Sequence, residues 1–292
     1  MSKVLIVGGD SFLSKELAPE LSRRGFVVTC STKNSVDKKK GFIYLDLLKP
    51  ESFPKKKFDV VILLAGIWGY QECAKNPVAK KVNIDNMAIL AKQLCQQGAF
   101  VSFISSNTVF GGEAPWCNEY AQHTPKFPYA EHKSLSEKKI KESICDIKKE
   151  NNFNIIRLTK ILGPETSPLP EWLDALENKR PLTPFADLIF APISVQYAAK
   201  HVADISTSRL PGAFHLSGKD NLNYHQLSTL LCETLNKDQN FITPTTSVKC
   251  GVSIPFLPKY SGLGMKHTTN SLGIIPQSIH SVIADIIKAR KN

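Results

Sequence analysis

Short apolar runs alternate with amphipathic segments along the first half of the chain. The runs predict strands covered on both faces, over residues 3–8, 26–33, 41–45, 58–66, 99–106 and 153–158. Between them apolar residues recur at helical spacing, over residues 11–24, 76–97 and 129–149. Strands that alternate with helices in this way predict an α/β fold with a doubly wound parallel sheet of the Rossmann type.

The pattern changes after Gly163-Pro164. Prolines interrupt the segment that follows, at positions 164, 168, 170, 181, 184 and 192. Helical spacing returns over residues 198–205, 224–235 and 278–288. We therefore expect a first domain over residues 1–163 and a smaller α+β lobe over residues 164–292, partly interleaved with the first.

The composition is that of an ordinary globular protein with a basic surface. Of the 292 residues, 42% are hydrophobic and 22% are charged, and the net charge is +11. The lysines are dispersed over predicted loops and outer helix faces without interleaved aromatic residues, so we expect no nucleic-acid partner. A basic surface of this kind would attract ligands that carry a diphosphate.

The seven cysteines and seven histidines are scattered along the chain. They show no Cys-x-x-Cys pair and no metal-ligand spacing, so we expect neither a disulfide framework nor a metal site. No apolar run reaches the roughly 18 residues that a membrane-spanning helix needs, and the N-terminus leads directly into a strand. These features predict a cytoplasmic protein with no membrane partner.

A tight turn joins the first predicted strand to the first predicted helix. It reads Gly8-Gly9-Asp10-Ser11-Phe12-Leu13. Glycine lets the backbone approach a pyrophosphate, which can then lie against the N-terminus of the helix. The residues that we expect to bind a dinucleotide here are Gly8, Asp10, Ser11, Phe12 and Leu13.

A second motif lies at the start of the predicted helix over residues 129–149. Tyr129 and Lys133 are four residues apart, so a helix places them on one face, one turn from each other. The lysine charge would favour the ionised form of the phenol, which suits Tyr129 to exchange a proton with a carbonyl or alcohol oxygen. Ser106 precedes them, at the end of the predicted strand 99–106. The three side chains are candidates for one catalytic site.

A phosphate-binding turn, then Ser106, then Tyr129 and Lys133 resemble, in this order, the short-chain dehydrogenase/reductase superfamily. More narrowly, the chain resembles the extended branch that acts on nucleotide sugars, and in particular the dTDP-4-dehydrorhamnose reductase family. The resemblance implies that Tyr129 gives a proton to a ketone, Lys133 assists and holds the nicotinamide ribose, and Ser106 hydrogen-bonds the ketone oxygen. The chain departs from the family pattern G-x-x-G-x-x-G, because Ser11 and Ser14 replace two glycines.

The same resemblance implies that the end of the predicted strand 26–33 faces the adenosine ribose. NAD-specific sites usually place a carboxylate there, whereas this chain offers Ser31, Thr32 and Lys33. Hydroxyls and a cation suit a 2′-phosphate, so we expect NADP as the cofactor, with NADPH preferred and NAD as the alternative. Asp46 and Leu47, which follow the next strand, lie beside the adenine in relatives.

Further cofactor contacts are expected at the ends of two central strands. Leu64, Ala65 and Gly66 end the predicted strand 58–66 and would let the backbone pass close to the cofactor. Ser105 would contact it from the neighbouring strand. With the Tyr-Lys pair, these residues complete the expected cofactor site.

The residues beside Ser106 narrow the chemistry. Nucleotide-sugar dehydratases of the superfamily carry Asp-Glu after the catalytic Ser or Thr, whereas this chain has Asn107-Thr108, so we set dehydration aside. The resemblance then implies an oxidoreductase that uses NADPH to reduce a 4-keto nucleotide-sugar of the dTDP-4-dehydro-6-deoxy-sugar type, in nucleotide-sugar and polysaccharide biosynthesis. Two alternatives stay open: an NAD-dependent nucleotide-sugar 4-epimerase, and a non-catalytic protein that binds a nucleotide sugar. The oligomeric state also stays open, with a homodimer among the options.

Overall fold

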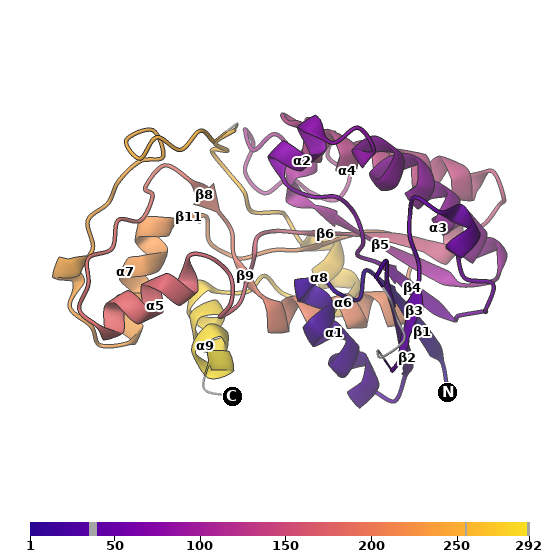
Figure 1. The fold of residues 1–292 in the computed structure, drawn as a ribbon, viewed down its shortest axis with the longest axis horizontal. Coiled ribbons are helices and arrows are strands. Elements are labelled where there is room, and N and C mark those ends of the chain that lie inside the picture. Colours follow the sequence, from indigo (N-terminus) through magenta and orange to yellow (C-terminus); the bar gives the residue numbers. More distant parts are fainter. Residues whose placement is uncertain (35–39, 255, 291–292) are drawn as a thin grey trace.

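One parallel sheet forms the centre of the computed structural model, which describes residues 1–34, 40–254 and 256–290. In this part of the chain, seven strands pair in the order β10-β6-β5-β4-β1-β2-β3 (Figure 1). The strands are β1 (Lys3–Val7), β2 (Val27–Thr32), β3 (Phe42–Tyr44), β4 (Val60–Leu63), β5 (Phe100–Ser106), β6 (Phe153–Leu158) and β10 (Gly212–Leu216). Every pairing in this sheet is parallel, which confirms the predicted α/β fold.

Helices cover both faces of the sheet (Figure 1). The helices on one face are α1 (Phe12–Arg23) and α6 (Val195–Ser208); those on the other are a π-helical turn (Lys81–Asn86), α3 (Met87–Gln96) and α4 (Pro128–Cys145). Side chains alternate along a strand, so Val4 and Ile6 of β1 pack with the first group while Leu5 and Val7 pack with the second. This burial on both faces explains why the strands read as continuous apolar runs.

The segment expected as one helix over residues 76–97 is helical over residues 79–96, with a π-helical turn in its first half. The short helix α2 (Tyr70–Lys75) ends before Pro77, and the chain then enters α3 through the π-helical turn. That turn carries Asn83, whose Nδ2 donates to the Ile67 carbonyl and whose Oδ1 accepts from the Ile67 N–H, both at 2.7 Å. Such turns are frequent at functional sites, and here the Asn83 amide fixes the loop that follows β4.

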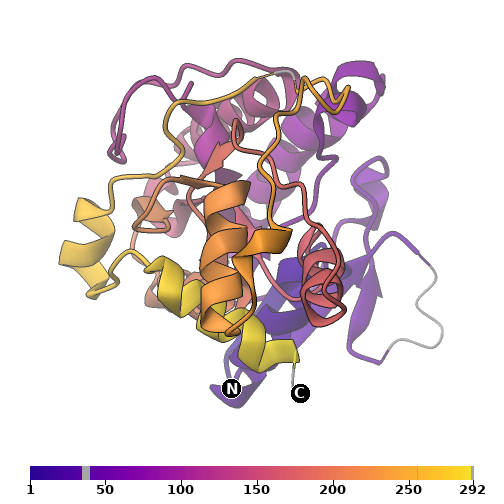
Figure 2. The same cartoon turned by 90° about the vertical axis from the view of Figure 1, so that its left-hand side faces the viewer.

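Residues of the second half build a smaller lobe with its own apolar core. Its helices are α5 (Leu169–Glu177), α7 (Tyr224–Thr234) and α9 (Ile279–Arg290), which face the viewer in Figure 2. Its short strand pairs are β8 (Ile189–Phe190) with β11 (Leu222–Asn223), and β7 (Ile161–Leu162) with β9 (Ile193–Ser194). Helix α6 and strand β10 lie beyond residue 163 yet belong to the sheet layers, so the chain crosses between the lobes more than once. The family resemblance implies that the second half of the chain forms the substrate-binding lobe, and this assignment stays a prediction.

Short elements complete the described chain. They are α8 (Lys266–Leu272) and the 3-10 turns Pro50–Ser52, Asn107–Val109, Glu150–Asn152 and Gln239–Phe241. Helix α8 lies beside β10, where the Thr268 hydroxyl accepts a hydrogen bond from the His215 N–H at 2.8 Å. Across residues 1–34, 40–254 and 256–290, no helix has the length and apolar character to cross a membrane.

Candidate active site

A cavity of about 810 Å³ opens at the carboxyl edge of the sheet. One wall comes from α4 and the segments that follow β1, β4, β5 and β6, and the other comes from residues 188–190 and 256–263 of the smaller lobe. The strand order reverses between β1 and β4, and ligands of open α/β sheets bind at such reversals. We therefore take this cavity as the candidate active site.

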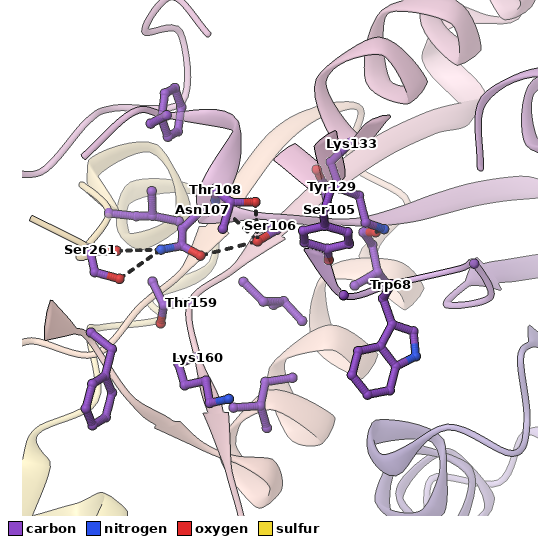
Figure 3. A pocket seen from close by; sticks show the side chains of 18 of the residues that line it. Trp68, Ser105, Ser106, Asn107, Thr108, Tyr129, Lys133, Thr159, Lys160 and Ser261 are labelled. Atoms are coloured by element: carbon purple, nitrogen blue, oxygen red, sulfur yellow. Dashed lines mark hydrogen bonds between the residues drawn. The ribbon is translucent and has the colours of Figure 1, made fainter. Parts of the chain in front are cut away.

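Ser106 ends β5 and caps the short turn Asn107–Val109. Its Oγ accepts hydrogen bonds from the Thr108 N–H at 3.2 Å and the Thr108 hydroxyl at 3.0 Å, and donates to Asn107 Oδ1 at 3.3 Å (Figure 3). Asn107 Nδ2 in turn donates to the carbonyl oxygen and to Oγ of Ser261, both at 2.9 Å. The Ser106 hydroxyl is thus part of a network that reaches the smaller lobe.

Tyr129 enters the cavity from the first turn of α4. Pro128 begins this helix, where its missing N–H would be unpaired anyway. The Tyr129 side chain is half-buried in the cavity wall (Figure 3). Burial raises the pKa of Tyr129 to about 12, while the nearby Ser106 hydroxyl lowers it in part. The phenol is therefore protonated at neutral pH.

Lys133 lies one turn further along α4 and is half-buried in the same wall. Its Nζ donates to the Ile104 carbonyl at 2.8 Å and lies 4.8 Å from the centre of the Phe103 ring. Burial lowers the pKa of Lys133 to about 8, and the negative charge of Glu137 offsets part of this effect. Most of the Lys133 population is therefore still charged at pH 7, on the helix face that carries Tyr129.

The turn between β1 and α1 forms the opposite end of the cavity. The residues of this turn that line the cavity are Asp10, Ser11, Phe12 and Leu13. Gly8 precedes them with a φ of +96°, and a Cβ there would lie 2.7 Å from the Ala65 nitrogen, so the turn needs glycine to pass the end of β4. Ser11 caps α1, because its hydroxyl accepts from the Ser14 N–H at 3.2 Å. The start of the helix, with amides that no helical carbonyl can pair, therefore borders the cavity.

The residues expected at the adenosine ribose lie outside this lining. Ser31 and Thr32 are buried. The Ser31 hydroxyl accepts from the Gly8 N–H at 3.2 Å, and the Thr32 hydroxyl accepts from the Asn34 N–H at 3.1 Å. Lys33 is exposed, so of the three expected side chains it is the one that meets solvent.

Asp46 and Leu47, which follow β3, also lie outside the cavity lining. Asp46 Oδ1 accepts from the Leu48 N–H at 2.9 Å, and the Leu47 side chain is buried. In contrast, the expected residues that line the cavity from the ends of β4 and β5 are Leu64, Ala65, Gly66 and Ser105. The structure thus divides the expected residues into a cavity set and a second set near β2 and β3.

Two polar residues that we did not predict line the cavity beyond β6. Thr159 and Lys160 follow Leu158, the last residue of that strand. A sequence signal for them existed, because the residues after the carboxyl end of a parallel strand belong to the ligand edge of the sheet. Tyr224 is a further lining residue, with its ring centre 4.4 Å from that of Phe190. No comparable signal marks Tyr224, because it reaches the cavity through packing in the smaller lobe.

Full charges are sparse in the cavity. Of the described residues that line it, those charged at neutral pH are Asp10, Lys133 and Lys160. Within the described chain, no group of three or more His, Cys, Asp or Glu side chains could hold a metal ion. The two lysines therefore dominate the electrostatics of a largely apolar site.

Comparison with known proteins identifies the family. Among solved structures, the fold is similar to a dTDP-4-dehydrorhamnose reductase from Clostridium acetobutylicum, with a TM-score of 0.82 and 22% identity over 99% of this chain and 100% of that one. A dTDP-4-dehydrorhamnose reductase from Bacillus anthracis, solved in complex with NADP, gives a TM-score of 0.83 and 18% identity over 99% and 98% of the two chains. Among curated proteins, methionine adenosyltransferase 2 subunit beta from Bos taurus is 24% identical over 270 residues, which is 84% of this chain and 75% of that protein. The family model of the RmlD substrate binding domain matches residues 2–292, so the predicted resemblance is confirmed and the chain belongs to this family.

Proposed function

We propose that this protein is an NADPH-dependent reductase of a 4-keto nucleotide-sugar, of the dTDP-4-dehydro-6-deoxy-sugar type. The observation that carries the proposal is that Ser106, Tyr129 and Lys133 line one cavity, with Tyr129 and Lys133 on one face of α4. Two of the similar solved structures are named as dTDP-4-dehydrorhamnose reductases, and these names support the same substrate class.

The cavity fits a dinucleotide at its β1–α1 end. Gly8 lets the turn pass close to Ala65, so that residues 10–13 at the start of α1 border the cavity. Residues 10–13 and 64–66 would hold the dinucleotide there, and when bound it would supply a hydride to the ketone carbon. Lys33 is exposed and would be available to a 2′-phosphate, and the similar reductase from Bacillus anthracis was solved with NADP. We therefore propose NADPH over NADH.

The chain's own residues handle the proton and the developing charge. Tyr129, which is protonated at neutral pH, donates its proton to the ketone oxygen as this oxygen gains negative charge. The Ser106 hydroxyl turns from Asn107 Oδ1 to the same oxygen, since Thr108 occupies its acceptor side but not its proton. Lys133 stabilises the phenolate that remains on Tyr129.

The protonation state of Tyr129 is the one that ketone reduction needs. Tyr129 is a neutral phenol at neutral pH and so carries the proton to be transferred, whereas alcohol oxidation needs the phenolate. An epimerase must perform both steps and keep its NAD throughout. Stoichiometric NAD in the isolated protein, with interconversion of two 4-hydroxy sugar nucleotides and no net use of cofactor, would identify an epimerase instead.

The test is NADPH consumption with a dTDP-4-keto-6-deoxy sugar, followed by nicotinamide absorbance. Tyr129→Phe removes the transferable proton, so turnover should fall about 100-fold or more while NADPH binding stays nearly intact. Tyr120→Phe is the matched control, because Tyr120 is exposed and lies outside the cavity lining. Near-normal turnover in Tyr129→Phe would eliminate Tyr129 as the acid.

A second candidate is a binding subunit without turnover. The similar curated protein is named as a subunit of a methionine adenosyltransferase, and Ser11 and Ser14 replace two glycines of the family turn. This candidate predicts that the protein binds a dinucleotide or nucleotide sugar but consumes no NADPH with any 4-keto nucleotide-sugar. NADPH consumption that depends on Tyr129 would reject it.

A further inference from the structure

Lys160 extends into the cavity from the segment that follows β6 (Figure 3). Its backbone is fixed, because the Lys160 carbonyl accepts a hydrogen bond from the Ile193 N–H at 2.9 Å, next to the β7–β9 pair. The segment between Leu158 and Ile161 is therefore held at the junction of the two lobes. From there the side chain reaches a space bordered by both.

The Lys160 ammonium has no hydrogen-bond or ion-pair partner within the described residues, unlike the other lysine of the cavity. Lys133 Nζ is held by the Ile104 carbonyl and the Phe103 ring. More than a third of the Lys160 surface is open to solvent, but that solvent fills a cavity with largely apolar walls. Partial desolvation by these walls lowers the pKa of Lys160. A cation in this situation gains most from an anion that enters the cavity.

We propose that Lys160 binds a phosphate group of the ligand that occupies this cavity. The inference deepens the proposed function, because both the dinucleotide and the nucleotide sugar of that reaction carry a diphosphate. Lysine binds phosphate as a compact point charge with three donors. Of the described lining residues, Asp10 is the one acidic group. The positive charge of Lys160 therefore favours a ligand that carries a negative charge.

Lys160 would also contribute to the choice of substrate. A ketone that lacks a phosphate would leave the ammonium partly desolvated and without an anion, and such unpaired charges weaken binding. A phosphate-bearing substrate would pair it. The neighbouring rings of Phe190 and Tyr224, 4.4 Å apart, offer apolar contact on the smaller-lobe side of the same cavity.

Calorimetric titration of the full chain with dTDP and, separately, with NADP⁺ tests the proposal. Lys160→Met should weaken the binding of at least one of these ligands by about 10-fold or more, as expected for loss of a hydrogen bond to a charged group. Lys160→Arg keeps the charge and should bind within a few-fold of wild type. Lys160→Gln repeats the test with a polar side chain in case the methionine variant does not fold.

The control is Lys200→Met, which makes the same change of charge on the exposed surface of α6, outside the cavity lining. A loss for dTDP assigns the phosphate to the nucleotide sugar, and a loss for NADP⁺ assigns it to the dinucleotide; either supports the proposal. Unchanged binding of both ligands in the folded Lys160 variants, or an equal loss in Lys200→Met, overturns it. So does failure of the wild type to bind either ligand.

Turnover separates this inference from the proposed function. A wild type that reduces the keto sugar, with Lys160 variants that bind both ligands normally, retains the reductase and rejects the role of Lys160. A wild type that consumes no NADPH but binds dTDP through Lys160 retains the role of Lys160 and rejects the reductase.

Discussion

Replacement of Arg157 should destabilise the fold, because this residue of β6 joins helix α4, which carries Tyr129 and Lys133, to the sheet. Arg157 and Glu137 are buried, with 4% and 3% of their surfaces exposed. Arg157 donates to both Glu137 oxygens, at 2.7 Å to 3.2 Å. It also donates to the Glu119 carbonyl at 2.9 Å and to ring nitrogens of His123 at 3.0 Å and His215 at 3.1 Å. Each nitrogen of the guanidinium thus donates a hydrogen bond inside the protein.

The expected loss for Arg157→Met follows from the charge left behind. Methionine fills a similar volume but leaves the Glu137 carboxylate buried without the guanidinium, with His123 Nε2 3.4 Å away. Breaking a buried ion pair in this way costs about 3–5 kcal/mol. The double variant Glu137→Met with Arg157→Met removes both charges, so it should be more stable than the single variant Arg157→Met.

Urea unfolding followed by circular dichroism measures these differences in the free energy of unfolding. Arg290→Met is the matched control, because Arg290 pairs with Glu177 on the surface, where the two side chains are 39% and 52% exposed. Surface pairs contribute at most about 1 kcal/mol. A loss in Arg157→Met no larger than in Arg290→Met, or a double variant less stable than Arg157→Met, would refute the reasoning.

Three further predictions concern pH, cofactor choice and the link between the lobes. Burial, and next the charge of Arg157, lowers the pKa of His215 to about 3, so the unfolded chain, with a histidine pKa near 6.5, binds more protons between these values. The free energy of unfolding should therefore fall as the pH drops below about 6.5, and His215 should contribute up to about 1.4 kcal/mol per pH unit to this fall. Urea titrations at several pH values measure the slope of stability against pH. This slope should be shallower in His215→Gln. Lys33→Asp should weaken NADPH binding more than NADH binding in a fluorescence titration, and an equal effect on both would contradict a 2′-phosphate at Lys33. Asn107→Ala removes both hydrogen bonds to Ser261, so the KM for the keto sugar should rise about 10-fold; an unchanged KM in steady-state kinetics would show that this link does not shape the substrate site.

Local patterns in the sequence were sufficient to predict the strands and helices in the first half of the fold. The strands β1, β4 and β5 are buried on both faces and read as continuous apolar runs. Helix α1 is amphipathic, with apolar residues at helical spacing. Both patterns are strong signals in a sequence. Helical spacing also placed Tyr129 and Lys133 on one face of α4 before any tertiary contact was known. That the carboxyl ends of β1, β4 and β5 share one edge followed from the parallel order, and so did most of the cavity set.

Contacts between distant segments decided the rest. The strand β10 (Gly212–Leu216) has only five residues and was not predicted, because it is a strand by virtue of pairing with β6. The side chains of Ser31 and Thr32 were expected to face a ribose, but their hydroxyls accept from backbone amides next to them. Strand patterns give the alternation of faces, whereas the partner of each hydroxyl depends on the neighbouring turn.

The sequence by itself therefore determined the type of fold, the order of the chemical groups along the chain and the placement of Tyr129 and Lys133 on one helix face. These features depend on spacing within single elements. Only the tertiary structure decided that Asn107 meets Ser261, that Arg157 joins α4 to β6, and that the Lys160 ammonium has no partner among the described residues. Each of those facts depends on which side chains from remote segments occupy the same space. Burial, and hence the pKa values of the cavity groups, follows from that packing and has no counterpart in a linear pattern.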